Sequence, residues 1–179
     1  CRSATGAPWH QWQGSWPSHR TPVHALALAP LALLLWQAWL VAGGADIDVL
    51  GADPVMEIEH RTGNWALRMP LATLAITPLR QLTGWTVLMR FRRMLGLYAF
   101  FYASLHLAAF LVLDLQGWWA TVFEEIVRRP YITVGFLAWL ILLPLAITST
   151  RGWMRRLGRT WARLHRLIHA AAILAVLHF

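Results

Sequence analysis

The amino-acid sequence predicts an all-α fold, an integral membrane helix bundle with five spans visible in its 179 residues. Hydrophobic residues make up 58% of the chain and charged residues 13%, against roughly 45–50% and about 25% in soluble domains. Uncharged runs recur along the chain, and one of them, residues 94–113, would form a helix of roughly 30 Å, the thickness of a bilayer core. The 16 basic residues, all arginine, lie between these runs, which favours membrane topology over nucleic-acid binding.

Two regions differ in composition. Residues 1–23 are rich in Trp, Pro, Gly and Ser and lack apolar periodicity, so we expect a disordered or non-native leader there. Residues 24–179 form the predicted transmembrane domain. Its first span covers residues 24–42, and the acidic segment 43–64 after it is expected to be a solvated loop. A calcium site in this segment is the weaker alternative, because its acids do not follow the spacing of an EF-hand.

The later spans alternate with basic or amphipathic connections. In order, we expect a second span at 65–79, a third at 94–113, an amphipathic interfacial segment at 115–130, a fourth span at 131–147 and a last apolar run at 164–179. Pro78 is expected to end the helix of the second span. The interfacial segment is expected to turn Trp118, Trp119 and Phe123 toward lipid.

Charge is divided unequally between the two sides of the predicted membrane domain. The N-terminal tail and the loops after the second and fourth spans carry twelve arginines and no acid, whereas the other side carries four arginines and all eight acids. Because arginine-rich short loops stay in the cytoplasm, we expect a multi-pass protein with a cytoplasmic N-terminus. The twelve arginines are Arg2, Arg20, Arg80, Arg90, Arg92, Arg93, Arg151, Arg155, Arg156, Arg159, Arg163 and Arg166.

Any metal or redox chemistry must rest on histidine, because Cys1 is the only cysteine. His106 lies about 12 residues from the cytoplasmic start of its span and His178 about 14 from the start of the last, so their depths agree within a few ångströms. This geometry is that of one histidine on each side of a haem ring, with both axial positions filled for electron transfer. A structural polar role for the histidines is the alternative. His165 and His169, spaced i and i+4, could serve a second haem, contact a propionate, or form an ordinary interfacial pair.

Eight segments carry a family resemblance: GADP at 51–54, HRTG at 60–63, LATLAITPLR at 71–80, RRMLGL at 92–97, YASLHL at 102–107, RRPYITVG at 128–135, LAITST at 145–150 and LGRTWARLHRL at 157–167. With these segments the chain resembles the MsrQ family of haem-binding membrane subunits, part of the ferric-reductase-like transmembrane group. The resemblance covers nearly everything from residue 50 onward, and residues 1–23 match nothing.

The resemblance implies a bacterial inner-membrane protein with haem b that takes electrons from a cytoplasmic flavin reductase. It would pass them to MsrP, a periplasmic molybdopterin enzyme that repairs oxidised methionine, and so act as an electron-transfer subunit instead of the site of substrate reduction. The family's functional histidines fall on His106, His165 and His178, with His106 and His178 the preferred axial pair. His169 departs from the family pattern, which often has an aromatic residue there, and a sixth span, usual in the family, is expected after Phe179.

The basic face is suited to an anionic partner. Arg92, Arg93, Arg155 and Arg156 lie in the expected cytoplasmic loops, where they could attract an acidic reductase surface. Flavin mononucleotide (FMN) has also been associated with the family, and these loops could hold its phosphate. Two other functions stay open: a ferric or quinone reductase cytochrome, and a transporter-like or structural membrane protein whose histidines relay protons or are satisfied core groups. The spans contain no carboxylate of the kind that a proton-coupled transporter would use.

Overall fold

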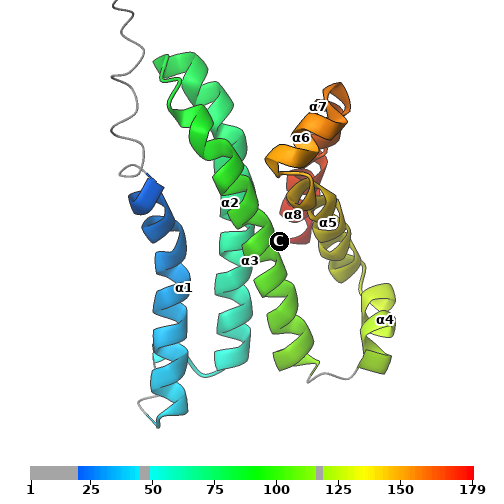
Figure 1. The fold of residues 1–179 in the computed structure, drawn as a ribbon. Helices are drawn as coiled ribbons and strands as arrows, with labels where there is room; N and C mark the ends of the chain where they lie inside the picture. The colour runs from blue at the N-terminus through cyan, green and yellow to red at the C-terminus, as the bar shows by residue number, and fades with distance from the viewer. Residues whose placement is uncertain (1–19, 45–48, 116–118) are drawn as a thin grey trace, which may run out of the picture.

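The computed structural model describes residues 20–44, 49–115 and 119–179, and this part of the chain contains helices and no strand, as predicted. Figure 1 shows the helices running up and down side by side, with two short helices at one end. In order they are α1 Arg20–Ala42, α2 Pro54–Thr83, α3 Leu88–Ala109 continued by the π-helical turn η2 Phe110–Asp114, α4 Trp119–Arg128, α5 Pro130–Ile147, α6 Arg151–Leu157, α7 Arg159–His165 and α8 Ile168–His178.

Three helices are long and apolar enough to cross a membrane: Thr21–Ala42, Leu88–Asp114 and Pro130–Ile147. They confirm the first, third and fourth predicted spans. The two other predicted spans fall on α2, which is long but carries several charged residues, and on α8, which has 11 residues. The count of five spans therefore stays a prediction.

The boundaries of α2 correct two expectations. The predicted acidic loop is helical from Pro54 onward, because Asp53 caps the helix by accepting hydrogen bonds from the N–H groups of Val55 and Met56, and proline suits the first helical position. The prediction that Pro78 ends the helix is also wrong, since α2 continues to Thr83. It ends at Gly84, whose left-handed backbone (φ 73°) lets its N–H bond to the carbonyl of Arg80.

The ends of two other predicted segments also differ from expectation. Helix α1 begins at Arg20, inside the predicted leader, whose residues 1–19 lie outside the described part of the chain. The predicted basic loop forms α6 and α7, and a turn at residues 166–167 separates α7 from α8. His165 and His169 therefore do not share a helix.

The predicted interfacial segment forms α4, on which Phe123 is exposed as expected, while the side chains of Trp118 and Trp119 lie outside the description.

The bundle consists of two helix pairs, each with its own cluster of buried residues, and side chains of α2 and α3 also pack against the second cluster. Helix α2 packs mainly on α3, and α5 packs mainly on α8, while α3 also contacts α5. Met69, Ala99 and Tyr102 belong to the core of the first pair, where the Tyr102 hydroxyl donates to the Ala27 carbonyl of α1 at 2.6 Å. The core of the second pair is Leu142, Leu145, Ile168 and Ala171. In each pair the first helix ascends and the second descends in the view of Figure 1.

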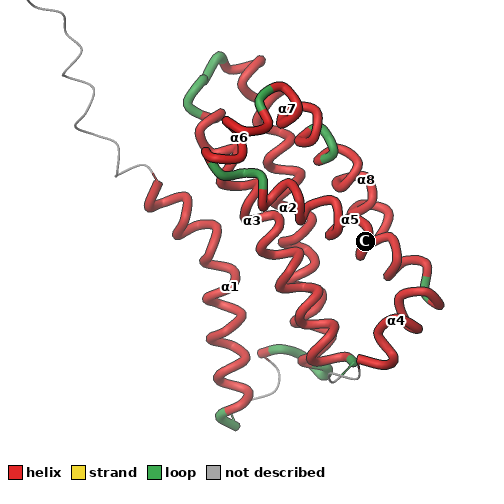
Figure 2. Tube along the Cα trace, turned by 45° about the vertical axis from the view of Figure 1, so that its right-hand side comes forward, coloured by secondary structure: helices red, strands yellow, loops and turns green. Residues whose placement is uncertain are grey.

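The connections gather at two opposite ends. The start of α1, the α2–α3 turn and the helices α6 and α7 lie at one end, and the end of α1, the start of α2 and α4 lie at the other, in both views (Figures 1 and 2). We call the first the arginine end and the second the acidic end, after the charges that the sequence places in these segments. This grouping is the one that the charge count predicts for alternating spans.

Candidate functional site: two facing histidines between the helix pairs

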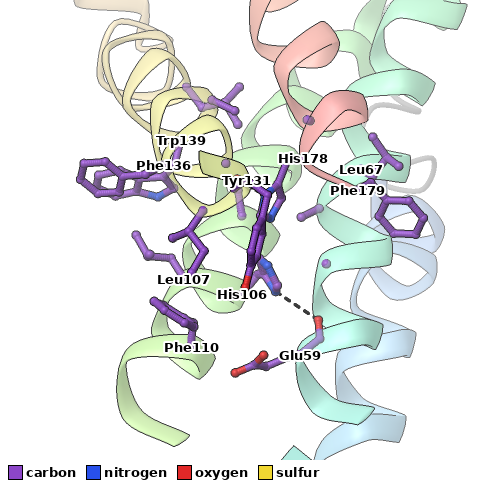
Figure 3. Close-up of a pocket in the computed structure, with 18 of the residues that line it drawn as sticks. Glu59, Leu67, His106, Leu107, Phe110, Tyr131, Phe136, Trp139, His178 and Phe179 are labelled. Carbon is purple, nitrogen blue, oxygen red and sulfur yellow. Dashed lines mark hydrogen bonds between the residues drawn. The ribbon is translucent and has the colours of Figure 1, made fainter. Parts of the chain in front are cut away.

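A cavity of about 530 Å³ lies between the two helix pairs, toward the acidic end (Figure 3). Its volume is in the range of cofactor and ligand sites, roughly 300–1,000 Å³. Helices α2, α3, α4, α5 and α8 all contribute to its wall, which is mostly apolar and includes Leu67, Leu107, Phe136 and Trp139. Three histidines, His60, His106 and His178, interrupt this apolar lining, and the last two face each other.

His106 of α3 is fixed by the main chain of α2. Its Nδ1 lies 3.1 Å from the carbonyl oxygen of Glu59, and this contact is the dashed line in Figure 3. A carbonyl oxygen can only accept, so Nδ1 carries the proton and donates it. In a neutral imidazole this leaves the lone pair on Nε2, the nitrogen that can bind a metal.

His178 of α8 is fixed in the same way by the main chain of α5. Its Nδ1 donates to the carbonyl oxygen of Tyr131 at 2.6 Å. The phenol ring of Tyr131 also stacks on the imidazole, with ring centroids 6.3 Å apart and an interplanar angle of 20°. Nε2 of His178 is therefore again the nitrogen with the lone pair.

The two imidazoles face each other across the cavity. Their ring centroids are 6.0 Å apart and their planes are turned by 62° (Figure 3). Two metal–nitrogen bonds of about 2 Å each, plus half a ring on either side, add up to roughly 6 Å. The spacing therefore matches one metal atom held between the rings.

Each imidazole lies against a glycine on the opposing helix. A Cβ at Gly63 would lie 3.2 Å from Cε1 of His106, and a Cβ at Gly135 would lie 2.7 Å from Cε1 of His178. Both glycines come four residues after the carbonyl that accepts the histidine hydrogen bond, Glu59 in α2 and Tyr131 in α5. In an α-helix that is the next turn on the same face, so glycine opens the path of each ring to its carbonyl.

The pair suits a metal that brings other ligands of its own. Two imidazoles do not complete a tetrahedral or octahedral shell, and the described residues contain no group of three or more His, Cys, Asp or Glu side chains that could hold a metal ion. The apolar cavity around the pair leaves room for a planar ligand between the rings. The arrangement can thus bind a metal macrocycle through both of its axial positions.

Polar side chains collect where the cavity meets the acidic end. Glu59, Asp114 and Arg129 line it there, and Oε1 of Glu59 is buried without a hydrogen-bond partner among the described residues. Glu59 lies before the apolar part of α2, and burial, followed by the charges of Asp114 and Asp53, raises the pKa of its carboxyl group. Arg129 bonds through Nε to Glu125 at 2.7 Å and through Nη1 to the hydroxyl of Tyr131 at 3.2 Å.

The two other candidate histidines lie outside this cavity. His165 ends α7 near the arginine end, where its Nε2 lies 3.1 Å from the Thr148 hydroxyl and its ring stacks on Trp161 at 4.1 Å. The Thr148 hydroxyl donates to the Pro144 carbonyl, so it accepts from His165. His169 is exposed, and its Nδ1 donates to the Arg166 carbonyl at 2.9 Å. The structure therefore brings together His106 and His178 and leaves His165 and His169 apart from them.

The sequence of the chain is similar to a known protein family. The family model described as "Ferric reductase like transmembrane component" matches residues 62–176. A protein of Xanthomonas euvesicatoria, named "Protein-methionine-sulfoxide reductase heme-binding subunit MsrQ", is 72% identical over 160 residues, covering 89% of this chain and 73% of the relative. The chain belongs to the MsrQ group of the ferric reductase-like transmembrane family. A Rhodospirillum rubrum protein of the same name is 48% identical over 156 residues, 87% of this chain and 73% of the relative. No solved structure matches.

Membership in the MsrQ group confirms the resemblance, and the structure adds residues that were not among the predicted site residues. These are the carbonyl-bearing Glu59 and Tyr131, the glycines Gly63 and Gly135, and Arg129. Main-chain acceptors cannot be recognised from side-chain type, but both glycines and Tyr131 fall inside the HRTG and RRPYITVG segments that carry the MsrQ resemblance. A glycine in a helix interior costs about 0.5–1 kcal/mol relative to alanine, and that cost is a signal of close approach.

Proposed function

We propose that the protein is a haem b electron-transfer subunit of a bacterial inner membrane. It takes electrons from a cytoplasmic flavin reductase and delivers them to a periplasmic molybdopterin methionine sulfoxide reductase of the MsrP type. In this proposal it is not itself the site of methionine sulfoxide reduction. The observation that carries the proposal is the facing pair of His106 and His178, each with Nδ1 bonded to a main-chain carbonyl.

The residues of the cavity fit a haem. His106 and His178 would supply the two axial nitrogens, and their Nδ1–H bonds fix the ring orientation and raise the basicity of the ligands. Gly63 and Gly135 leave space beside both rings, and the wall around them is mostly apolar. A haem held by both histidines would supply reversible one-electron chemistry. This set of residues therefore favours electron transfer over ferric-substrate binding at the metal.

The unequal charge of the two ends supports the direction of transfer. The arginine end would face the cytoplasm, where Arg92, Arg93, Arg155 and Arg156 attract an acidic reductase surface and raise its rate of encounter. FMN bound through its phosphate is a further candidate at this end, since the cavity lies nearer the acidic end and an electron must first cross part of the bilayer. His165 lies there too and stays a candidate for a second site.

Reduction of the haem by the donor and its reoxidation by the acceptor test the proposal. The purified protein in nanodiscs should show the sharp visible bands of reduced haem b with dithionite and also with NADH plus a flavin reductase. Reoxidation should follow addition of an MsrP-type enzyme only when methionine sulfoxide is present. Absence of haem bands would favour the transporter-like function, whereas reoxidation by ferric chelates or quinones alone would favour the ferric or quinone reductase.

Reporter fusions test the proposed orientation independently. A reporter placed after Asp53 or near Glu124 should be periplasmic, and one near Arg92 or Arg156 should be cytoplasmic. The reverse pattern would overturn both the membrane orientation and the direction of electron flow.

A further inference from the structure

Arg129 differs in charge from the other residues around the cavity. Of the described residues that line it, Arg129 is the only arginine, and none is a lysine. The acidic side chains in the lining are Glu59 and Asp114, on α2 and η2. A ligand with acidic groups would therefore be repelled by the α2–η2 side and attracted to the corner between α4 and α5, where Arg129 lies.

Backbone conformation and hydrogen bonds fix the corner between α4 and α5, where Arg129 lies. Because the next residue is Pro130, Arg129 cannot adopt helical geometry easily and takes an extended conformation, φ −110° and ψ 100°, which ends α4 and starts α5. Its N–H bonds to the Glu125 carbonyl at 3.1 Å, and the Thr133 hydroxyl bonds to the Ile126 carbonyl across the corner. The guanidinium therefore starts from a fixed backbone position.

The side-chain contacts of Arg129 leave it able to bind an acid. The bonds to Glu125 and to the Tyr131 hydroxyl use two of the five N–H donors of a guanidinium. The Tyr131 hydroxyl accepts from Arg129 and can still donate its own proton. Together they present a charged fork and a hydroxyl donor at the cavity mouth, a combination suited to a carboxylate.

We propose that Arg129 and Tyr131 form the subsite that anchors a haem propionate, so that the propionate edge of the ring faces the α4–α5 corner at the acidic end. This inference rests on the proposed haem-binding function and adds the orientation of the ring within the cavity. Tyr131 links the two parts of the site, because its carbonyl orients His178 and its hydroxyl contacts Arg129.

The α4–α5 corner offers a matched control. Arg128 is adjacent, is paired with Glu124 as Arg129 is paired with Glu125, and does not line the cavity. Arg128→Gln therefore removes the same charge and the same kind of ion pair without touching the proposed subsite. Glu125→Gln separates anchoring from ion pairing, since it removes the partner of Arg129 and leaves the guanidinium in place.

The experiment compares haem with its dimethyl ester, which lacks the propionate charges. Full-length protein is loaded with either compound, its absorbance spectrum is recorded, and transfer to apomyoglobin is timed. Wild-type protein should release the ester about tenfold faster than haem, since a charged hydrogen bond is lost. Arg129→Gln should release haem about tenfold faster, with unchanged bis-histidine bands, and should release the ester no faster than wild type does. Arg128→Gln and Glu125→Gln should retain haem as wild type does.

Several outcomes would overturn the anchor. One is equal acceleration of haem and ester release by Arg129→Gln, which would indicate a general loosening of the corner. Another is the same acceleration in Glu125→Gln, which would assign the effect to the ion pair. Failure of the wild-type protein to bind haem at all would instead overturn the proposed function, so the two failures are distinguishable.

Discussion

The two helix pairs hold their histidines by the same local arrangement but with different tightness. In the α2–α3 pair, Nδ1 of His106 lies 3.1 Å from the Glu59 carbonyl, and in the α5–α8 pair, Nδ1 of His178 lies 2.6 Å from the Tyr131 carbonyl. The space beside the rings differs in the same sense, because an added Cβ would lie 3.2 Å from Cε1 of His106 and 2.7 Å from Cε1 of His178.

The orientation of each candidate ligand is therefore set by the neighbouring helix. A main-chain carbonyl fixes the tautomer, and a glycine one turn later lets the ring reach it. His165 provides the contrast, because a hydroxyl and a stacked Trp161 hold it and its Nε2 is already bonded. A histidine in a membrane bundle is thus identified as a candidate ligand by its partners, and depth alone does not distinguish it.

The largest expected effect is the loss of either facing histidine. His106→Ala and His178→Ala should each retain less than about a tenth of the wild-type haem, since each removes one of the two proposed iron ligands. His169→Ala is the control, because His169 is exposed and bonds only within its own segment. Haem content is measured per protein after purification. Full retention of haem in His106→Ala would contradict the assignment of His106, in the α2–α3 pair, as a haem ligand.

The next effect tests whether His178 is packed more closely against Gly135 than His106 is against Gly63. Gly135→Ala should weaken haem binding more than Gly63→Ala does, because overpacking costs about 1–3 kcal/mol and the Gly135 contact is the closer one. Gly152→Ala in α6 is the matched control, since a Cβ there meets no neighbouring atom within 4 Å. Haem release to apomyoglobin gives the ranking. Equal release from Gly135→Ala and Gly152→Ala would show that the close approach is not needed.

A smaller effect is expected for His165. His165→Ala should keep the haem between His106 and His178 and should lower the free energy of unfolding by about 1–2 kcal/mol, through loss of the Thr148 bond and the Trp161 stack. Absorbance spectra and chemical denaturation in detergent measure the two quantities. Loss of all haem in this variant would mean that His165 supports the same haem and that the contrast with His106 fails.

The smallest effect concerns electron entry at the arginine end. Replacing Arg92 and Arg93, or Arg155 and Arg156, by Gln should slow haem reduction by a flavin reductase severalfold at low salt and leave haem content unchanged. Rising ionic strength should slow the wild-type reaction in the same way. Stopped-flow reduction across a salt series provides the rates. If neither salt nor the substitutions alter them, the arginines serve membrane topology alone.

Apolar runs were sufficient to predict three of the helices as membrane spans, because hydropathy and length are properties of the sequence itself. Residue counting also paired His106 with His178, although it started from residues 94 and 164, whereas α3 begins at Leu88 and α8 at Ile168. The helical start at Pro54 and the passage of α2 through Pro78 were missed, because a cap at Asp53 and tertiary packing outweighed the local signals. Glu59 and Tyr131 could not be found in this way, since they act through main-chain carbonyls whose position depends on which helices pack together.

Electron paramagnetic resonance of the oxidised protein shows whether one haem iron is held by both imidazoles across the cavity. The imidazole planes are turned by 62°. Axial imidazoles turned well away from each other give a low-spin ferric signal dominated by one large g value, and this is the spectrum that the structure predicts. A high-spin signal would show that one axial position is not filled by histidine. A rhombic low-spin signal of nearly parallel rings would contradict the orientation set by the Glu59 and Tyr131 carbonyls.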